Sequence, residues 1–201
     1  MPANAVLDRS GVSCDLRIEA ESVDNALMER VRRGEEAALD ALLRRYWRPL
    51  VAFSLGFVRD LDNAEDVVQE TFVRIWQRRC DWQPNGSVRS YLYRITRNIS
   101  LNERRAREVR DRWQTNRLRY PHRSSATPAQ QFDAEQLRAA IEVAVLALPE
   151  RRRTVFLLAR FHDLSRRQIA EVMGISPQTV ANQLSAALST LRAALAPLLD
   201  E

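Results

Sequence analysis

Apolar residues recur at spacings of three and four along nearly the whole 201-residue chain, which is the period of an amphipathic α-helix. Strands are poorly supported, because alternating runs of β-branched residues are few and the chain has only five glycines. Hydrophobic residues make up 45% of the chain, enough for one large core or two small ones. The predicted fold class is therefore all-α.

The stretch RWQTNRLRYPHRSSATPAQQ, residues 112–131, separates two helical parts of the sequence. It has two prolines, a serine pair, no acidic residue and no apolar period, which is typical of a linker. We predict two helical domains, at residues 24–107 and 132–201, joined by a flexible linker at 108–131. Residues 1–23 form an N-terminal extension to which the sequence assigns no role.

Local signals predict where helices start in the first domain. The apolar period begins near Asp24. Pro49 opens a further helix, since proline is favoured at the first helical position. Asp62 is the expected cap of the next helix. A long helix is predicted from Val88 to about Arg107.

The sharpest motif is LSRRQIAEVMGISPQTVANQLSAAL, residues 164–188. Ser165 and Gln168 have the spacing of a capping box, and Gly174 can take the left-handed conformation of a tight turn. Ser176, followed by a proline, can cap a second helix. This spacing predicts a helix-turn-helix in the second domain, and an ordinary helical hairpin is the alternative.

The second helix of this motif would present polar side chains that can hydrogen-bond to base edges or phosphates in a major groove. Because no charged residue occurs between Pro177 and Leu191, two arginines of the preceding helix would supply most of the phosphate contacts. The candidate duplex-binding residues are Arg166, Arg167, Ser176, Gln178, Thr179, Asn182, Gln183 and Ser185.

The positive charge of the chain is concentrated in one block. All 31 basic residues are arginine, and the formal net charge is +5. Residues 87–123 hold 11 arginines against three acids, a local charge of +8, so the rest of the chain is slightly acidic. A basic block of this kind is typical of a surface that binds nucleic acid.

The long helix at the start of this block has two faces. Leu92, Ile95 and Ile99 share an apolar stripe, so Tyr93 and several arginines fall on the other side. Arginines can hold a phosphate backbone while an aromatic ring stacks on an unpaired base, which suits single-stranded nucleic acid. A solvated basic face is the alternative.

The segment DNAEDVVQETFVRIWQ, residues 62–77, predicts a helix with an acidic outer face in a basic protein. Val68, Phe72 and Ile75 project to one side, and acids, amides and Val73 project to the other. A solvated face is the usual explanation, but an exposed valine among acids also describes a docking surface for a basic partner.

Several function classes are excluded by what the sequence lacks. It has no glycine-rich phosphate loop and no G-x-S-x-G, and Cys14 and Cys80 lack the spacing of zinc ligands. No apolar run approaches 18 residues, and the start lacks a secretory pattern. We therefore expect a cytoplasmic protein without catalysis, cofactor, metal, small-molecule substrate or membrane insertion. Two alternative functions remain at this point. One is a free-standing DNA-binding regulator, and the other, less well supported, is a helical enzyme that acts on nucleic acid.

Three ordered segments resemble the bacterial sigma factors of the extracytoplasmic-function (ECF) type, over about residues 24–199: DNAEDVVQETFVRIWQ, SVRSYLYRITRNISLNERRAR and LPERRRTVFLLARFHDLSRRQIAEVMGISPQTV. The resemblance implies a promoter-specificity subunit that binds core RNA polymerase and promoter DNA, and that an anti-sigma factor commonly sequesters. By this resemblance the acidic helix binds the clamp helices of the polymerase, through Asp66, Gln69, Glu70, Val73 and Trp76.

The same resemblance implies that the long basic helix and the turn before it open the minus-ten promoter element and capture unpaired bases. The corresponding positions are Trp82, Asn85, Arg89, Tyr91, Tyr93, Arg94, Arg97 and Asn98. The helix-turn-helix would then recognise the minus-thirty-five element in the major groove.

Overall fold

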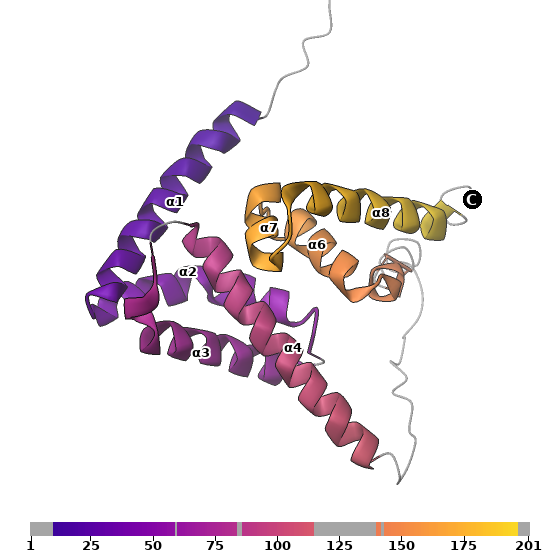
Figure 1. Ribbon diagram of the computed structural model, residues 1–201, viewed down its shortest axis with the longest axis horizontal. Helices are drawn as coiled ribbons and strands as arrows, with labels where there is room; N and C mark the ends of the chain where they lie inside the picture. Colours follow the sequence, from indigo (N-terminus) through magenta and orange to yellow (C-terminus); the bar gives the residue numbers. More distant parts are fainter. Residues whose placement is uncertain (1–9, 59, 84–85, 115–139, 142, 197–201) are drawn as a thin grey trace, which may run out of the picture.

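The computed structural model describes residues 10–58, 60–83, 86–114, 140–141 and 143–196. These residues contain helices and turns but no strand (Figure 1). The predicted all-α fold class is therefore confirmed. Most of the predicted linker lies outside the described residues. The elements are α1 (Ser10–Arg32), α2 (Glu36–Ser54), α3 (Leu61–Gln77), the short 3₁₀-helix η1 (Arg79–Asp81), α4 (Val88–Gln114), α6 (Glu150–Arg160), α7 (Arg166–Met173) and α8 (Pro177–Leu195).

Two helices differ from the sequence prediction at their N-terminal ends. Helix α1 begins at Ser10, well before the predicted start near Asp24. Helix α3 is capped by Asp60 rather than Asp62, because the Asp60 carboxylate accepts the Asn63 backbone N–H at 2.9 Å. A cap of this kind satisfies one of the free N–H groups of the first turn.

Pro49 does not open a helix, as the sequence predicted, but lies inside α2. A proline in a helix interior removes one backbone hydrogen bond and tends to kink or break the helix. Leu42, Leu50 and Phe53 lie on both sides of it in the same helix and are fully buried. Burial of this continuous apolar stripe outweighs the lost hydrogen bond, so one helix runs where two were predicted.

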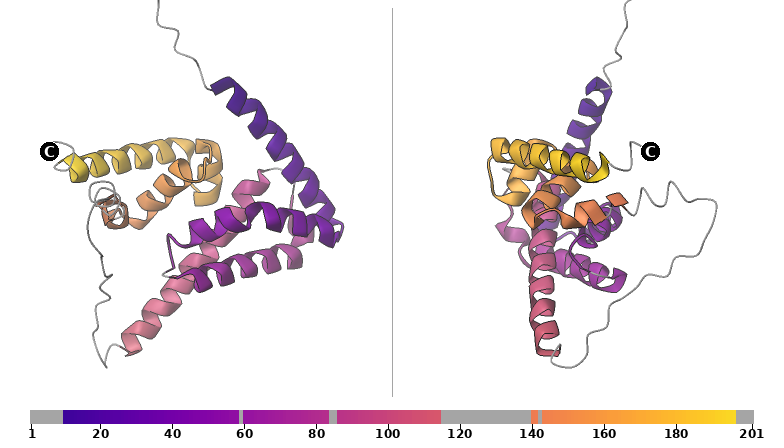
Figure 2. Two further views of the ribbon diagram at one scale, coloured as in Figure 1. Left: turned by 180° about the vertical axis from the view of Figure 1, so that it is seen from behind. Right: turned by 90° about the vertical axis from the view of Figure 1, so that its right-hand side faces the viewer.

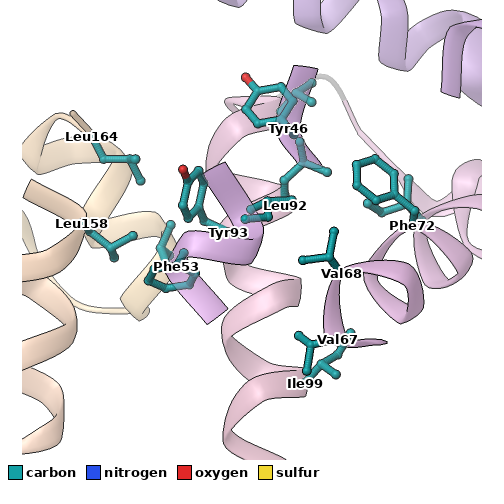
Figure 3. Packing of buried hydrophobic residues seen from close by; sticks show 14 of the residues in the cluster. Tyr46, Phe53, Val67, Val68, Phe72, Leu92, Tyr93, Ile99, Leu158 and Leu164 are labelled. Atoms are coloured by element: carbon teal, nitrogen blue, oxygen red, sulfur yellow. The ribbon is translucent and has the colours of Figure 1, made fainter. Parts of the chain in front are cut away.

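The core of the first domain lies where α2, α3 and α4 meet. Phe53 of α2, Val68 and Phe72 of α3 and Leu92 of α4 pack together there (Figure 3). Two pairs of buried hydroxyls cross between helices, with Ser54 Oγ 3.1 Å from Ser100 Oγ and Thr71 Oγ1 3.2 Å from Thr96 Oγ1. Each of these polar groups therefore has a partner inside the core.

The helix-turn-helix is confirmed by its local geometry. Ser165 and Gln168 form the capping box at the start of α7, and Gly174 ends that helix in the left-handed conformation with φ of 64°. The Ser176 hydroxyl accepts the Thr179 backbone N–H at 3.1 Å and so caps α8. The side chains that face the crossing of the two helices are buried: Ile169, Ala170, Val172 and Val180.

Helix α4 contacts both domains. It packs against α2 and α3 on one side and against α7 on another, while its C-terminal half extends past the other helices (Figure 2). A single buried cluster contains residues of both domains, including Leu158 and Leu164 of the second (Figure 3). At Gly56 the approach is close, because a Cβ there would lie 2.9 Å from Leu157 Cδ1. The two domains therefore share a packed interface.

Candidate functional site

The outer face of α3 is exposed, as the sequence predicted. Asp66 and Gln69 are exposed, Glu70 and Trp76 are half-buried, and Val73 has 48% of its surface exposed. The inward-facing residues are buried: Ala64, Val67, Val68, Thr71, Phe72 and Ile75. We call Asp66, Gln69, Glu70, Val73 and Trp76 the α3 surface.

Two members of the α3 surface, Glu70 and Trp76, are each in contact with an arginine. Glu70 accepts a hydrogen bond from Arg74 Nε at 2.6 Å. The Arg79 guanidinium lies 4.5 Å from the centre of the Trp76 ring, in a cation–π contact. Val73 lies between these two groups without being covered by either, so an apolar contact area remains open to a partner.

A pocket of about 440 Å³ lies between η1, the loop after it and the start of α4. Among the predicted minus-ten residues, Trp82, Tyr91 and Arg94 line it. The Arg94 guanidinium lies 5.7 Å from the centre of the Tyr91 ring. Asn85 lies outside the described residues. The other lining residues include Asp81, Gly86, Ser87, Ser90 and Glu171.

Tyr93 is fully buried, so the prediction that its ring lies on an open face of α4 is wrong for this structure. The ring centre is 5.1 Å from that of Phe53 and 5.3 Å from that of His162. Its hydroxyl is hydrogen-bonded to His162 Nδ1 at 3.1 Å. The ring lies between Phe53 of the first domain and His162 of the second, and the helical period of α4 alone predicts neither contact.

Burial of this tyrosine–histidine pair favours the neutral form of both groups. Burial raises the pKa of Tyr93 to about 12. Burial, followed by the positive charge of Arg89, lowers the pKa of His162 to about 4. Both side chains are therefore neutral near pH 7, and their hydrogen bond involves no net charge.

The predicted DNA-binding arginines of α4 differ in their surroundings. Arg89 donates a hydrogen bond to the His162 carbonyl, whereas Arg94 is exposed, as is Asn98. Arg97 is half-buried, and burial lowers the pKa of its guanidinium. Among the described residues, Arg97 Nε has no hydrogen-bond partner. This nitrogen is buried, so it is not open to a ligand in this structure.

The predicted duplex-binding residues lie at the start of α7, at the N-cap of α8 and along α8. Gln183 is half-buried and the other seven are exposed. Arg167 has 90% of its side chain exposed. The side chains of Gln178 and Asn182 are joined by a hydrogen bond of 3.1 Å from Nε2 to Oδ1. We call these eight residues the α8 surface.

Sequence reasoning missed four side-chain contacts that join α1, α4 and the residue before it to the second domain. Gln168 Nε2 donates to Ser87 Oγ at 3.2 Å and to Glu21 Oε1 at 2.5 Å. Glu150 forms an ion pair with Arg104, and His162 accepts from Arg89. These contacts join positions 46 to 147 apart in the sequence, and no local pattern predicts them.

The part of the chain that the structure describes holds no group of three or more histidine, cysteine, aspartate or glutamate side chains placed to bind a metal ion. Within the same residues, no helix combines the length and apolar character needed to cross a membrane.

Comparison with protein families gives two matches in the order of the two domains. Residues 42–110 match the family described as Sigma-70 region 2. Residues 138–191 match the family described as Sigma-70, region 4.

Two curated relatives extend over most of the chain. RNA polymerase sigma-H factor of Pseudomonas aeruginosa is 28% identical over 186 residues, covering 89% of this chain and 96% of the relative. ECF RNA polymerase sigma factor SigL of Mycobacterium tuberculosis is 31% identical over 167 residues, covering 80% of this chain and 90% of the relative.

Two solved structures have a similar fold. CnrH in complex with the cytosolic domain of CnrY has a TM-score of 0.65 and 24% identity, covering 87% of this chain and 98% of CnrH. The sigma factor RpoE of Bartonella quintana, in complex with the anti-sigma factor NepR, has a TM-score of 0.60 and 22% identity, covering 78% of this chain and 95% of RpoE.

Proposed function

Since this chain belongs to the sigma-70 family, as an RNA polymerase sigma factor of the ECF type, we propose that three of its surfaces divide promoter recognition between them. The protein directs RNA polymerase to promoters, with a region 2 domain for the minus-ten element and a region 4 domain for the minus-thirty-five element. It is a specificity subunit, and catalysis belongs to the polymerase. One observation carries the proposal: an acidic and apolar face of α3, a basic and aromatic face of α4 and the uncharged polar face of α8 lie on three different helices.

The α3 surface is proposed to bind the clamp helices of the polymerase. It combines an uncovered valine with carboxylates on the same helical face, so it can bury apolar area against a basic partner. Charge on its rim would steer the encounter, and the apolar centre would hold the complex.

The pocket and three arginines of the first half of α4, Arg89, Arg94 and Arg97, are proposed to capture unpaired bases of the minus-ten element. Separating a few base pairs costs several kcal/mol, and base–aromatic stacking of about 1–3 kcal/mol per base can offset this cost. Tyr91 supplies a ring at the pocket, the exposed Arg94 supplies donors for the strand backbone there, and the half-buried Arg97 lies about one helical turn further along α4. The proposed residues of this site are Trp82, Asn85, Arg89, Tyr91, Tyr93, Arg94, Arg97 and Asn98.

The α8 surface is proposed to recognise the minus-thirty-five element in the major groove. Amide side chains such as Gln178 and Asn182 can make bidentate hydrogen bonds to adenine, while Arg166 and Arg167 contact phosphates. All four side chains are exposed and lie next to the capped N-terminus of α8 or on the helix before it.

Three further expectations belong to this proposal. The proposed domain bounds are 24–107 and 132–201, with a linker at 108–131. The helix of α4 continues beyond the end near Arg107 that the sequence predicted, through the first seven residues of this linker to Gln114. We place the protein in the cytoplasm, where bacterial RNA polymerase works on the chromosome. A protein partner that sequesters the free chain is also proposed, since RpoE of Bartonella quintana is seen in complex with an anti-sigma factor.

Reconstitution with core RNA polymerase tests the proposal. We expect the full chain to confer promoter-dependent transcription on genomic DNA, and Arg97→Ala to slow promoter opening about tenfold while polymerase affinity is unchanged. Opening is measured by the permanganate reactivity of unpaired thymines. The matched control is Arg105→Ala, which removes the same charge from an exposed position of the same helix. Equal opening by the two variants would contradict the role of Arg97.

Substitutions on the α8 surface should change sequence preference and not opening. Gln178→Ala or Asn182→Ala should relax discrimination at one upstream base pair by about 5- to 150-fold, because a bidentate contact is worth about 1–3 kcal/mol. Transcription from a promoter library randomised in its upstream element measures this preference. Ser189→Ala, at an exposed position further along α8, is the control. Identical preferences for all these proteins would exclude the α8 surface as the reader of the upstream element.

A further inference from the structure

Arginines of α4 surround a carboxylate at the start of α6. Arg104 forms an ion pair with Glu150, with 24% and 32% of the two side chains exposed. The hydrogen bond from Arg104 lowers the pKa of Glu150, and the positive charges of Arg104, Arg97 and Arg105 lower it further. Three guanidinium groups of one helix therefore lie within electrostatic range of a single carboxylate on another.

Two arginines in the first turn of α6 reach the same place. Burial lowers the pKa of the Arg153 guanidinium, and the positive charge of Arg104 lowers it further. Burial also lowers the pKa of Arg97, to which the charges of Arg151 and Arg105 add. Arg97 and Arg153 therefore each lie within electrostatic range of a like charge on the other helix.

This cluster holds more positive charge than the carboxylates beside it can neutralise. Glu108, whose Oε1 lies 3.3 Å from Arg104 Nε, is the second carboxylate recorded there among the described residues. Elsewhere an arginine such as Arg74 has a carboxylate of its own, in that case Glu70. The cluster instead has five guanidinium groups for two carboxylates, an excess of three positive charges. We call these five arginines the α4–α6 cluster: Arg97, Arg104, Arg105, Arg151 and Arg153.

The α4–α6 cluster is both ordered and accessible. Two of its arginines are exposed and the other three are half-buried. Arg153 Nη1 donates to the Leu146 carbonyl oxygen at 3.1 Å, and Arg104 is held by its two carboxylates. Since these side chains are already fixed, a ligand that binds them loses little free energy to ordering them.

We propose that the α4–α6 cluster binds a compact anion with adjacent phosphate groups, either an inorganic oligophosphate or the oligophosphate of a nucleotide. A guanidinium pairs with phosphate oxygens through two parallel hydrogen bonds, and an anion with three or more charges would neutralise the excess. The arginines approach one place from two helices, whereas a nucleic-acid backbone presents its charges in a row. This convergence favours a compact ligand. The site stands apart from the promoter surfaces proposed above, although it shares Arg97 with one of them.

Isothermal titration calorimetry of the free full chain with sodium tripolyphosphate, in about 150 mM sodium chloride, tests the site. We expect one bound anion per chain and at least about tenfold weaker binding of sulfate, which has fewer charges and no adjacent anionic group. Arg151→Ala should weaken tripolyphosphate binding about tenfold, because it removes charge-assisted hydrogen bonds from an exposed position. Absence of tripolyphosphate binding to the unchanged chain would overturn the proposal.

Arg160→Ala is the matched control, because it removes the same charge from an exposed position at the other end of α6. It should change the affinity for tripolyphosphate by less than about twofold. Equal losses for Arg151→Ala and Arg160→Ala would mean diffuse attraction to a basic protein, and the proposal would be wrong. It would also be wrong if Arg151→Ala weakened binding of a fluorescein-labelled single-stranded oligonucleotide as much as binding of tripolyphosphate, since the cluster would then be a nucleic-acid surface.

The same titration with ATP and GTP distinguishes the two sources of the oligophosphate. Tighter binding of either nucleotide than of tripolyphosphate would identify a nucleotide as the ligand, because the base or sugar then adds contacts. Equal or weaker binding would identify an inorganic oligophosphate.

Glu108→Gln should shift the affinity in the opposite direction. The side chain of Glu108 is 53% exposed, so the substitution carries little risk to folding, which circular dichroism checks. It removes a carboxylate that competes with the anion for Arg104, and tripolyphosphate binding should become about two- to fivefold tighter. Unchanged or weaker binding by a folded Glu108→Gln protein would contradict a site that contains Arg104.

Discussion

Val73→Arg is expected to remove most of the affinity of this sigma factor for core RNA polymerase while its fold stays intact. The side chain lies at the centre of the α3 surface and is 48% exposed, so a longer residue fits in the free protein. In the complex, the substitution would place a charge in an apolar contact that faces a basic partner. Loss of a central contact costs about 2 kcal/mol or more, which is roughly a 30-fold loss of affinity.

Val109→Arg is the matched control for this prediction. Val109 is 51% exposed on the solvent side of α4, and the substitution changes size and charge by the same amount. Biolayer interferometry with immobilised core polymerase measures both affinities. Comparable affinities for the two variants would mean that the polymerase binds elsewhere than on the α3 surface.

Phe53→Ala should cause the largest loss of stability of any single change considered for this protein. Phe53 is fully buried, and its ring centre lies 5.1 Å from that of Phe57, 5.1 Å from that of Tyr93 and 5.4 Å from that of His162. Truncation to alanine removes these contacts and leaves a cavity where the two domains meet. Core substitutions of this kind cost about 3–5 kcal/mol of the free energy of unfolding.

Phe161→Ala is the control for this prediction, because Phe161 is 61% exposed and has its ring contact with Phe156 of its own domain. It should change the free energy of unfolding by less than about 1 kcal/mol. Urea titration followed by far-ultraviolet circular dichroism measures both variants. A similar urea midpoint for both would show that Phe53 is not a central residue of the core.

The sequence predicted those parts of the fold that depend on neighbours in the chain. The capping box of Ser165 and Gln168, the left-handed Gly174 and the Ser176 cap all join residues within a few positions, and all three are confirmed. The exposed face of α3 was predictable for the same reason, since its helical period alone separates Val73 from Phe72.

The sequence could not predict what depends on contacts between distant parts of the chain. Pro49 has the local preference of a first helical residue, but burial of the stripe around it keeps α2 continuous. Tyr93 has the helical phase of an exposed residue, but His162, 69 positions later, covers it. Residue roles at the pocket and on the α8 surface stay predictions, because they concern partners outside the chain.

The absence of charge between Pro177 and Leu191 of the recognition helix has a consequence for how promoter choice responds to salt. Binding at α8 displaces few counterions from DNA, so the contribution of that helix changes little with ionic strength. Binding at the basic helix α4 displaces many counterions, so the affinity of α4 for the strand falls as the salt concentration rises. Under osmotic stress, promoters with a well-matched upstream element would therefore keep their activity better than promoters that depend on the minus-ten element.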